Sequence, residues 1–427
     1  MIIHVVQPGE TIYSISDYYQ LPAITIIQEN GITNPDNLVI GQTIVIVYPK
    51  IVYTVVEGDT LESIAYKNDT NVYQILRNNP YLSDREYLYP GEPIVISFET
   101  EKNMTISTSG YAYPFIDKDI LKKTLPFLTY LSIFHYRITL SGDIIDIDDE
   151  EIIQIAKDYN VAPMMLIATL SESGVGSKEV AYNILKNMEI QERFIDNVVN
   201  TLKSKGYYGV NIYLQYIDSE NLIIIEQFMQ RFATRMHEEG FRVVLTVTPN
   251  LKFELTDVEY EKVDYSTIMQ TVDGLLIASY DWGFSYRPPA SITPVNLVRE
   301  SLDNIVTMVP PDKIFVGLSI IGYDWPLPYI PGYTRANALT TESAIELANA
   351  EGVAILYDMV TQAPYFFYTD LGDNFHLVWF KDARSIDVIV DLVPEYGFAG
   401  LSIWNIMQFF AQMWLVINVQ YEIEKVL

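Results

Sequence analysis

Beyond residue 105, short apolar segments of strand length alternate with longer stretches in which apolar residues recur at helical spacing. Eight parallel strands separated by helices are the pattern of a TIM barrel. This alternation therefore predicts an α/β fold, a (β/α)8 barrel, over residues 106–427. The expected strands are Ile106–Ala112, Tyr130–His135, Met164–Thr169, Gly209–Tyr216, Arg242–Thr248, Gly274–Tyr280, Ile314–Ile321 and Gly400–Asn405.

The interval between the seventh and eighth expected strands is long and rich in aromatic residues. We expect an inserted segment at about residues 322–384, a hairpin that walls a groove on the barrel. A short polar stretch, FETEKNMT at residues 98–105, links the barrel to the part of the chain that precedes it.

That preceding part contains one pattern twice. The segment HVVQPGETIYSIS at residues 4–16 recurs as YTVVEGDTLESIA at residues 53–65. Paired positions, each 49 residues apart, are Gly9 with Gly58, Thr11 with Thr60, Ile15 with Ile64 and Asn30 with Asn79. Each copy reads as strand, turn, helix, helix, turn, strand. We therefore predict two small α+β domains, at residues 1–49 and 50–98.

Local chemistry explains most of the repeated positions. The Gly-acidic-Thr triplet closes the strand and caps the first helix, because the Thr oxygen accepts from free amides there. Asn30 and Asn79 follow the second helix, where we expect a residue whose backbone tolerates unusual angles.

The whole two-copy pattern resembles the LysM domain and exceeds what helix capping alone requires. The resemblance implies that N-acetylglucosamine chains lie in a shallow groove between two turns of each copy. In the first copy these turns are Gly9–Ile12 and Asn34–Ile40, and in the second they are Gly58–Leu61 and Tyr87–Leu88. The implied glycan-binding residues are Gly9, Glu10, Thr11, Ile12, Gly58, Asp59, Thr60 and Leu61. The isolated segment Met1–Phe98 is expected to bind such polymers.

Charge narrows the possible partners. The chain has 55 acidic and 27 basic residues, a formal charge of -28. Nucleic acid and anionic membrane surfaces are excluded because both require clustered Lys and Arg, whereas neutral glycans remain available. With no cysteine and four scattered histidines, we expect no metal site and no cofactor.

The N-terminus, MIIHVVQPGETIYSI, has no basic region followed by an apolar core, and no run approaches the ~18 apolar residues of a membrane span. We therefore expect synthesis in the cytoplasm without a signal peptide.

Aromatic residues recur at the C-terminal ends of the expected barrel strands, where TIM barrels place their functional groups. They are Tyr111, Tyr113, Tyr213–Tyr216, Tyr280, Trp282 and Trp404. For any one of them, packing in the core is a sufficient explanation. Their joint placement indicates a site for sugar rings, whose apolar faces stack on aromatic side chains.

Three segments resemble family 18 of the glycoside hydrolases: YYGVNIYLQY at residues 207–216, SYDW at residues 279–282 and GLSIWN at residues 400–405. Further segments, YDWGFSYRPPASITPV, YDMVTQAPYFFY and VWFKDARS, resemble the spore cortex-lytic N-acetylglucosaminidases of endospore formers, which also carry two LysM units. The resemblance implies that Tyr280, Asp281, Trp404 and Tyr111 bind substrate.

The fourth-strand segment departs from the family at both positions that carry the chemistry. The family has a Glu that protonates the glycosidic oxygen and an Asp that orients the acetamido group of the substrate. Alignment places Gln215 at the Glu and Tyr213 at the Asp. Gln keeps hydrogen-bonding capacity but has no acidic proton, and Tyr cannot stabilise positive charge as a carboxylate does.

These departures favour a catalytically inactive relative that binds peptidoglycan, spore cortex or a chitin-like polymer at the spore coat or surface. One alternative is an active N-acetylglucosaminidase in which Glu172, Asp218 or Glu220 supplies the acid. Another is a structural scaffold that binds other spore coat proteins, which would have a blocked barrel end and inactive LysM grooves.

Overall fold

The computed structural model describes residues 1–83, 85, 87–168, 178–213, 221–249, 251–253, 258–260, 263–279 and 287–427. In these residues, eight parallel strands close into a barrel, since β5 pairs with both β6 and β20. In barrel order the strands are β5 (Met104–Ala112), β6 (Tyr130–Ile138), β8 (Ala162–Ala168), β9 (Gly209–Tyr213), β10 (Arg242–Val247), β13 (Gly274–Ile277), β14 (Ile314–Ser319) and β20 (Gly400–Trp404). The predicted α/β barrel and its eight strands are confirmed.

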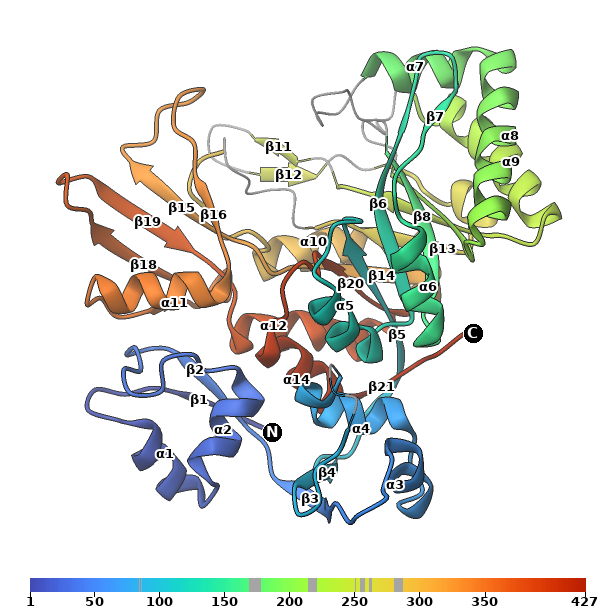
Figure 1. Ribbon diagram of the computed structural model, residues 1–427. Coiled ribbons are helices and arrows are strands. Elements are labelled where there is room, and N and C mark those ends of the chain that lie inside the picture. The colour runs from blue at the N-terminus through green and yellow to red at the C-terminus, as the bar shows by residue number, and fades with distance from the viewer. Residues whose placement is uncertain are drawn as a thin grey trace.

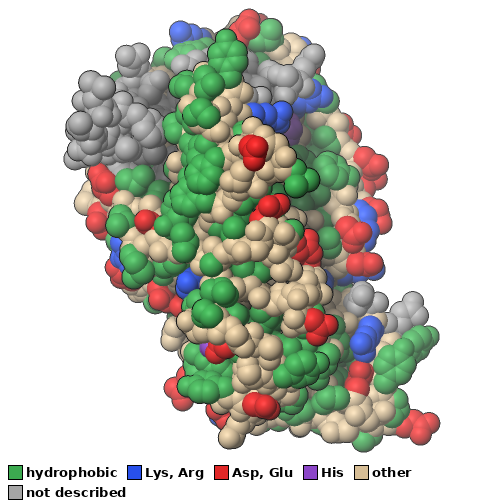
Figure 2. Space-filling view, turned by 90° about the vertical axis from the view of Figure 1, so that its left-hand side faces the viewer, with side chains coloured by type: hydrophobic (Ala, Val, Ile, Leu, Met, Phe, Trp, Pro, Cys, Tyr) green, Lys and Arg blue, Asp and Glu red, His purple; other side chains and the backbone are tan. Residues whose placement is uncertain are grey.

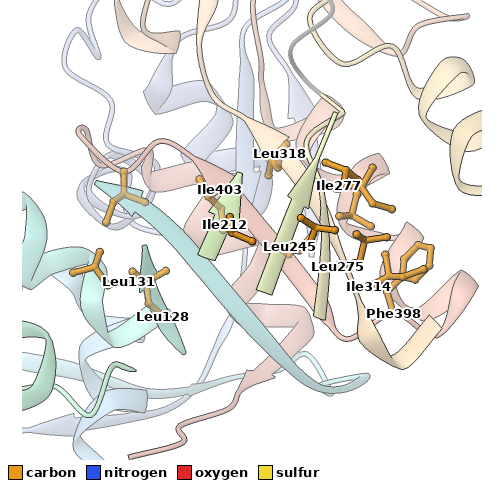
Figure 3. Packing of buried hydrophobic residues seen from close by; sticks show 14 of the residues in the cluster. Leu128, Leu131, Ile212, Leu245, Leu275, Ile277, Ile314, Leu318, Phe398 and Ile403 are labelled. Carbon is orange, nitrogen blue, oxygen red and sulfur yellow. The ribbon is translucent and has the colours of Figure 1, made fainter. Parts of the chain in front are cut away.

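Alternation along the strands separates two layers of core. Every second residue points outward, and these side chains pack beneath the helices, as Ile212, Leu245 and Leu275 do in Figure 3. The intervening residues fill the barrel interior, where the neighbours of these three positions are Asn211, Thr246 and Leu276. Burial on both faces explains why the strands read as nearly continuous apolar runs.

Helices surround the barrel (Figure 1). They are α5 (Lys118–Thr124), α6 (Glu150–Asp158), α7 (Lys178–Lys186), α8 (Met188–Lys205), α9 (Leu222–Glu238), α10 (Val295–Ile305), α12 (Ala383–Val390), α13 (Leu392–Tyr396) and α14 (Ala411–Gln420). Short pieces complete this part: β7 (Ile144–Ile145), β11 (Leu251–Phe253), β12 (Val258–Tyr260), β21 (Tyr421–Ile423) and the 3-10 turns Leu125–Phe127, Ile268–Gln270 and Pro311–Lys313.

The two N-terminal repeats have one architecture. The first repeat consists of β1 (Ile2–Val5), α1 (Ile12–Tyr19), α2 (Ala23–Asn30) and β2 (Thr43–Ile46). The second consists of β3 (Pro49–Thr54), α3 (Leu61–Lys67), α4 (Val72–Asn78), a 3-10 turn (Pro80–Leu82) and β4 (Pro93–Phe98). In each repeat the two strands pair antiparallel beside the two helices, which is the predicted order of elements.

The predicted backbone role of the two repeated residues, Asn30 and Asn79, was wrong. Asn79 has φ of -137°, outside the left-handed region, and Asn30 lies inside α2, with the left-handed residue Gly31 after it. The side chain is what matters. Asn30 donates to the carbonyl of Val45 at 2.8 Å and accepts from its amide at 2.6 Å, and Asn79 bonds both backbone groups of Val95 in the same way.

The inserted segment is larger than the predicted hairpin. It forms a five-stranded antiparallel sheet in the order β16-β15-β19-β18-β17, and helix α11 packs on one face. Its elements are β15 (Gly322–Leu327), β16 (Asn337–Leu339), α11 (Thr341–Ala350), β17 (Leu356–Asp358), β18 (Ala363–Thr369) and β19 (Phe375–Trp379). We call these residues, 322–379, the inserted domain.

Helix α14 joins the barrel to both repeats, which lie on either side of it in Figure 1. Gln412, near its start, donates to Asn30 Oδ1 at 3.2 Å and to the Thr43 carbonyl at 2.6 Å. Asn418, near its end, donates to Asn78 Oδ1 at 2.8 Å. The helix is almost wholly buried because repeats and barrel cover it from different sides.

The first repeat also docks on the inserted domain. The amide of Ile355 donates to the carbonyl of Ile40 at 2.9 Å, and Val39 is buried in the apolar cluster beneath α11. The approach is so close that a β-carbon at Gly41 would lie 2.0 Å from the Ile355 carbonyl oxygen. Gly41 also has φ of +88°, so this position requires glycine on both grounds.

Figure 2 views the side that lies at the left of Figure 1 and shows acidic side chains spread over that face. Hydrophobic side chains gather toward its top. The exposed apolar residues of the inserted domain include Tyr333 and Leu371. Within the described part of the chain, no helix is long and apolar enough to cross a bilayer.

Candidate functional site

The C-terminal end of the barrel gathers aromatic side chains from three strands. The ring of Trp404, at the end of β20, meets that of Tyr111 on β5 at 5.4 Å between centroids and that of Phe134 on β6 at 5.1 Å. Tyr113 adds a fourth ring, 6.5 Å from Trp404 and 4.9 Å from Phe134. Trp404 is only partly buried, so this cluster has a face toward solvent.

A chain of neutral polar groups lies below these rings. The buried hydroxyl of Tyr111 is 3.1 Å from Thr246 Oγ1 and accepts from Asn211 Nδ2 at 3.2 Å. Thr246 in turn donates to Asn211 Oδ1 at 2.7 Å. These bonds fix Tyr111, which the sequence indicated as a sugar-binding residue, deep in the barrel. The Tyr111 ring packs in an edge contact with the Trp404 ring and is not itself exposed for stacking on a sugar.

Tyr213 lies two residues beyond Asn211 on β9 and therefore points to the same interior face. Its hydroxyl is 2.8 Å from Thr248 Oγ1 beside β10. Tyr213 and Trp404 both pack against the cluster formed by Tyr111, Leu166, Ala168 and Leu276. The large ring of Tyr213 thus belongs to the inner wall of the barrel.

None of the eight barrel strands, as bounded above, contains Asp or Glu. Burial raises the pKa of the Tyr113 hydroxyl and lowers that of the His135 imidazole, with nearby Arg137 adding to the second effect. Both shifts keep these groups uncharged at neutral pH. The described strands at this end of the barrel therefore supply hydrogen-bonding groups but no carboxyl groups.

Several sequence-predicted residues lie outside the described residues: Gln215, Tyr280, Asp281 and Trp282, together with Glu172, Asp218 and Glu220. The structure brings together Tyr111, Tyr113, Tyr213 and Trp404 from those that remain. Sequence reasoning missed Phe134, Asn211 and Thr248. Asn211 was detectable, because alternation along a strand puts it on the face of Tyr213; the other two depend on pairing between distant segments.

The turn before the first helix of each repeat has the predicted construction. Thr11 and Thr60 are N-caps, each accepting from the amide three residues on at 3.1 Å, in capping boxes with Ser14 and Ser63. Gly9 and Gly58 have φ of +85° and +88°, which only glycine adopts without strain.

The acidic residue of each triplet fastens its turn from inside. Glu10 accepts from the Gln7 amide at 2.7 Å and bonds His4 at 2.8 Å. Asp59 accepts from the Val56 amide at 2.9 Å and from Lys67 at 2.6 Å. These bonds lower the pKa of both carboxyls, led for Glu10 by the backbone amide and for Asp59, to about 2, by Lys67.

Both implied grooves have exposed walls. In the first repeat, Gly9, Thr11 and Asn34 are exposed, and so is the side chain of Ile40, although its carbonyl docks on the inserted domain. In the second repeat, Gly58 and Tyr87 are exposed. Ile12 is buried and Leu61 partly buried, so these two serve the packing of their helices.

Comparison with known families divides the chain in the same way as its structure. Residues 142–408 match the family described as glycosyl hydrolases family 18. Residues 4–47 and 53–97 each match the LysM domain. The described residues hold no group of three or more His, Cys, Asp or Glu that could bind a metal ion.

Individual relatives share the whole arrangement. The chain is 30% identical to the cortical fragment-lytic enzyme of Bacillus subtilis (strain 168), over 100% of this chain and 99% of that protein. It is also 30% identical to the putative sporulation-specific glycosylase YdhD of the same organism, over 95% of each. The crystal structure of the spore cortex-lytic enzyme SleL of Bacillus megaterium QM B1551 is similar with a TM-score of 0.82 and 31% identity, covering 100% of this chain and 99% of that one.

Proposed function

The chain belongs to family 18 of the glycosyl hydrolases and carries two LysM domains, and we propose that it is a catalytically inactive member that binds N-acetylglucosamine glycans. The glycan is spore cortex peptidoglycan or a similar polymer. The two N-terminal repeats, here called the first and second LysM domains, hold the polymer, and the C-terminal end of the barrel contacts it without cleaving it.

One observation carries the proposal: the fourth barrel strand lacks both carboxyl groups on which the chemistry of the family rests. Tyr213 stands at the position of the Asp and Gln215 at that of the Glu. Gln215 cannot protonate a glycosidic oxygen, because a carboxamide has no acidic proton. Tyr213 is uncharged at neutral pH and a weaker acid than a carboxylic acid, so it cannot replace the charge of the Asp and is a poor proton donor. Within the described bounds of the eight barrel strands no Asp or Glu is present, which is consistent with this interpretation.

Sugar binding at the barrel is supported by the groups that remain. Trp404 presents a partly exposed ring, and Tyr111 and Phe134 hold it from below through edge contacts. Asp281 and Tyr280, which the family resemblance assigns to the acetamido group and the sugar ring, follow the sixth strand. A ring platform flanked by polar groups is suited to a neutral pyranose.

The LysM domains give the wall-binding function its independent support. Both keep the turn geometry, with a glycine in the left-handed region, a fastened carboxyl group and a Thr cap. Because the relatives that align over the full length are named for cortex lysis and sporulation, we place the protein at the spore coat or spore surface. Other coat proteins are expected neighbours there.

The test separates binding from cleavage. The full-length protein is incubated with insoluble chitin and with cortex fragments, and bound protein and newly formed reducing ends are measured in the same samples. We expect retention on both polymers and no reducing ends above a buffer control. Cleavage that is lost on removal of Glu172, Asp218 or Glu220 would instead identify a relocated acid, and failure to bind would favour a scaffold.

A further inference from the structure

A cavity of about 280 Å³ lies where both LysM domains, the barrel and the inserted domain meet. Its walls come from the ends of α2 and α4, the start of α14 and one side each of α5 and α11. These elements are far apart along the chain, so the cavity exists only because the four parts dock. It is separate from the C-terminal end of the barrel, and it shares Asn34 and Asn37 with the turn Asn34–Ile40 of the first LysM groove.

Aromatic residues form the barrel side of the cavity. Trp414 and Phe127 stack with their centroids 5.0 Å apart, and Phe409 lies 6.1 Å from Phe127. Lys123 places its ammonium group 4.6 Å from the centroid of the Phe409 ring. Phe410, which also lines the cavity, is partly exposed. Because Trp414 and Phe127 are almost wholly buried, the apolar surface that this wall offers to a sugar ring comes from the partly exposed Phe409 and Phe410.

Carboxamides form much of the opposite side. Asn30 and Asn78 line the cavity but are already engaged with the strands of their own domains and with α14. Asn34 and Asn349, on facing elements of the rim, are exposed. Carboxamides donate and accept at one group, which matches the paired hydroxyl and acetamido functions of an amino sugar.

The charged lining residues are balanced. Arg77 and Lys123 are basic, whereas Glu342 and Glu346 are acidic. The fifth, Glu29, is uncharged at neutral pH, because burial raises the pKa of its carboxyl to about 8. A balanced lining favours an uncharged ligand over an anionic or a cationic one.

Three buried polar atoms of lining residues have no hydrogen-bond partner within the described structure. They are Glu29 Oε1, Arg77 Nε and Trp414 Nε1. Buried donors and acceptors without partners are uncommon in folded proteins. Two donors and one acceptor without partners therefore belong to residues that line one cavity.

We propose that this cavity binds one N-acetylhexosamine unit of the glycan, as a site that begins at the edge of the first LysM groove, extends beyond it and is distinct from the barrel end. The proposal rests on the function proposed above, since it concerns the same polymer. The volume is near the small end of ligand sites, which span roughly 300–1,000 Å³, and so suits a single ring. The loop at residues 405–410 connects Trp404 directly to Phe409 and Phe410, placing the two sugar-binding walls on one continuous segment.

Trp414 provides a local reporter. The chain has five Trp residues, and protein labelled with 5-fluorotryptophan gives a fluorine NMR line for Trp414 that the Trp414→Phe variant identifies. The protein is titrated with tri-N-acetylchitotriose and, in parallel, with maltotriose, which lacks acetamido groups. We expect a saturable shift of the Trp414 line with the first sugar and none with the second.

Two variants test the position. Asn349→Trp fills the cavity from the exposed rim of α11, and Ala350→Trp places the same side chain at the neighbouring exposed position, which does not line the cavity. We expect Asn349→Trp to weaken the titration of Trp414 about tenfold or more and Ala350→Trp to leave it unchanged. Glu346→Trp, a second filling variant on the same helix, should behave like Asn349→Trp.

The outcomes distinguish this site from the proposed function. Retention on chitin together with an unmoved Trp414 line overturns the cavity site and leaves the proposed function standing. Equal titrations of Asn349→Trp and the unmodified protein overturn it as well. If neither chitin retention nor any fluorine shift is seen, the proposed glycan binding itself is wrong.

Discussion

Tyr213 and Gln215 carry the argument about catalysis at the scale of single residues. General acid catalysis contributes about 10²–10⁴-fold, and correct positioning of the acetamido nucleophile contributes a further large factor. The two losses affect one mechanism, so their effects should not add. Gln215→Glu alone should therefore recover little activity, because the acetamido group stays unsupported. Tyr213→Asp with Gln215→Glu should raise the release of reducing ends from chitin oligomers by about 10²-fold or more over background.

The contact between Tyr213 and Thr248 provides a control for that prediction. The Tyr213 hydroxyl meets Thr248, so a smaller Asp leaves Thr248 without this partner and opens space beside Trp404. Tyr213→Phe is the matched control, since it removes the hydroxyl and keeps the ring. It should remain inactive with or without Gln215→Glu. Equal activity of Gln215→Glu alone and of Tyr213→Asp with Gln215→Glu would show that position 213 is unimportant for the chemistry.

Glu29 should make stability depend on pH in an unusual direction. Burial raises its folded-state pKa from 4.5 to about 8, so the unfolded chain loses the proton first. Stability contributed by the protonated form is therefore lost as pH rises from about 4.5 to about 8, by roughly 2–4 kcal/mol after allowance for partial exposure. Glu29→Gln should remove this slope and be more stable than the unmodified protein at pH 8. Urea unfolding at several pH values measures the free energy of unfolding of both proteins. The prediction is contradicted if this free energy depends on pH in the same way for Glu29→Gln and the unmodified protein.

Residue roles that depend on neighbours in sequence were predictable, and those that depend on the fold were not. Thr11 and Thr60 cap their helices as expected, because a cap is satisfied within three residues. Asn30 and Asn79 were assigned a backbone role, yet their side chains clamp a strand about 15 residues away. Tyr111 was expected among the substrate-binding residues at the end of its strand, and the local sequence gave no sign that its buried hydroxyl lies 3.1 Å from Thr246, 135 residues further on.

At the scale of elements, α14 determines how the LysM domains sit on the barrel. Gln412 is buried and makes three hydrogen bonds to the first LysM domain, to Asn30 and to both Thr43 oxygens. Gln412→Ala should lower the free energy of unfolding by about 1–3 kcal/mol, since buried partners on Thr43 are left unsatisfied. It should also make the first LysM domain more sensitive to limited proteolysis.

Gln420 supplies the matched control on the same helix. Its amide bonds Asp387 inside the barrel domain and reaches neither LysM domain. Gln420→Ala should therefore leave the proteolytic pattern of the LysM domains unchanged. Cleavage at the same sites and rates in both variants would mean that α14 does not hold the first LysM domain in place.

The pattern of apolar residues predicted the positions of strands that are buried on both faces, and it predicted the other strands less well. All eight barrel strands were predicted because each is an apolar run bounded by polar turns. The inserted domain was expected as a hairpin and is a five-stranded sheet with a helix. Short strands such as Asn337–Leu339 and Leu356–Asp358 carry little periodicity of their own and form because longer partners pair with them.

At the scale of the whole molecule, the docked LysM domains should bind a long glycan together. Two linked sites on one polymer gain avidity of roughly 10²–10⁴ if both engage at once. Ile40→Glu and Tyr87→Glu each place a charge at an exposed apolar position of one groove. Each single change should weaken retention on insoluble chitin, and the pair should reduce it by far more than either alone. Retention that is unchanged by one single change and reduced equally by the other and by the pair would mean that only one groove binds.

Because the LysM domains dock on the barrel, the isolated segment Met1–Phe98 is a poor sample for measuring glycan binding. Val45, Val47 and Phe98 are buried in the main core together with barrel residues, so the segment Met1–Phe98 alone exposes apolar surface. Binding by the LysM domains is better measured in the full chain, with the groove variants as controls.

The most direct measurement of the central claim follows binding and cleavage in one sample of full-length protein with cortex fragments. Protein in the pellet reports binding, and new reducing ends in the supernatant report hydrolysis. The Tyr213→Asp, Gln215→Glu variant shows what activity would look like on this scaffold. The account predicts that the unmodified protein is retained and releases no reducing ends or muropeptides above buffer. Clear release by the unmodified protein, absent from a sample without the barrel, would contradict it.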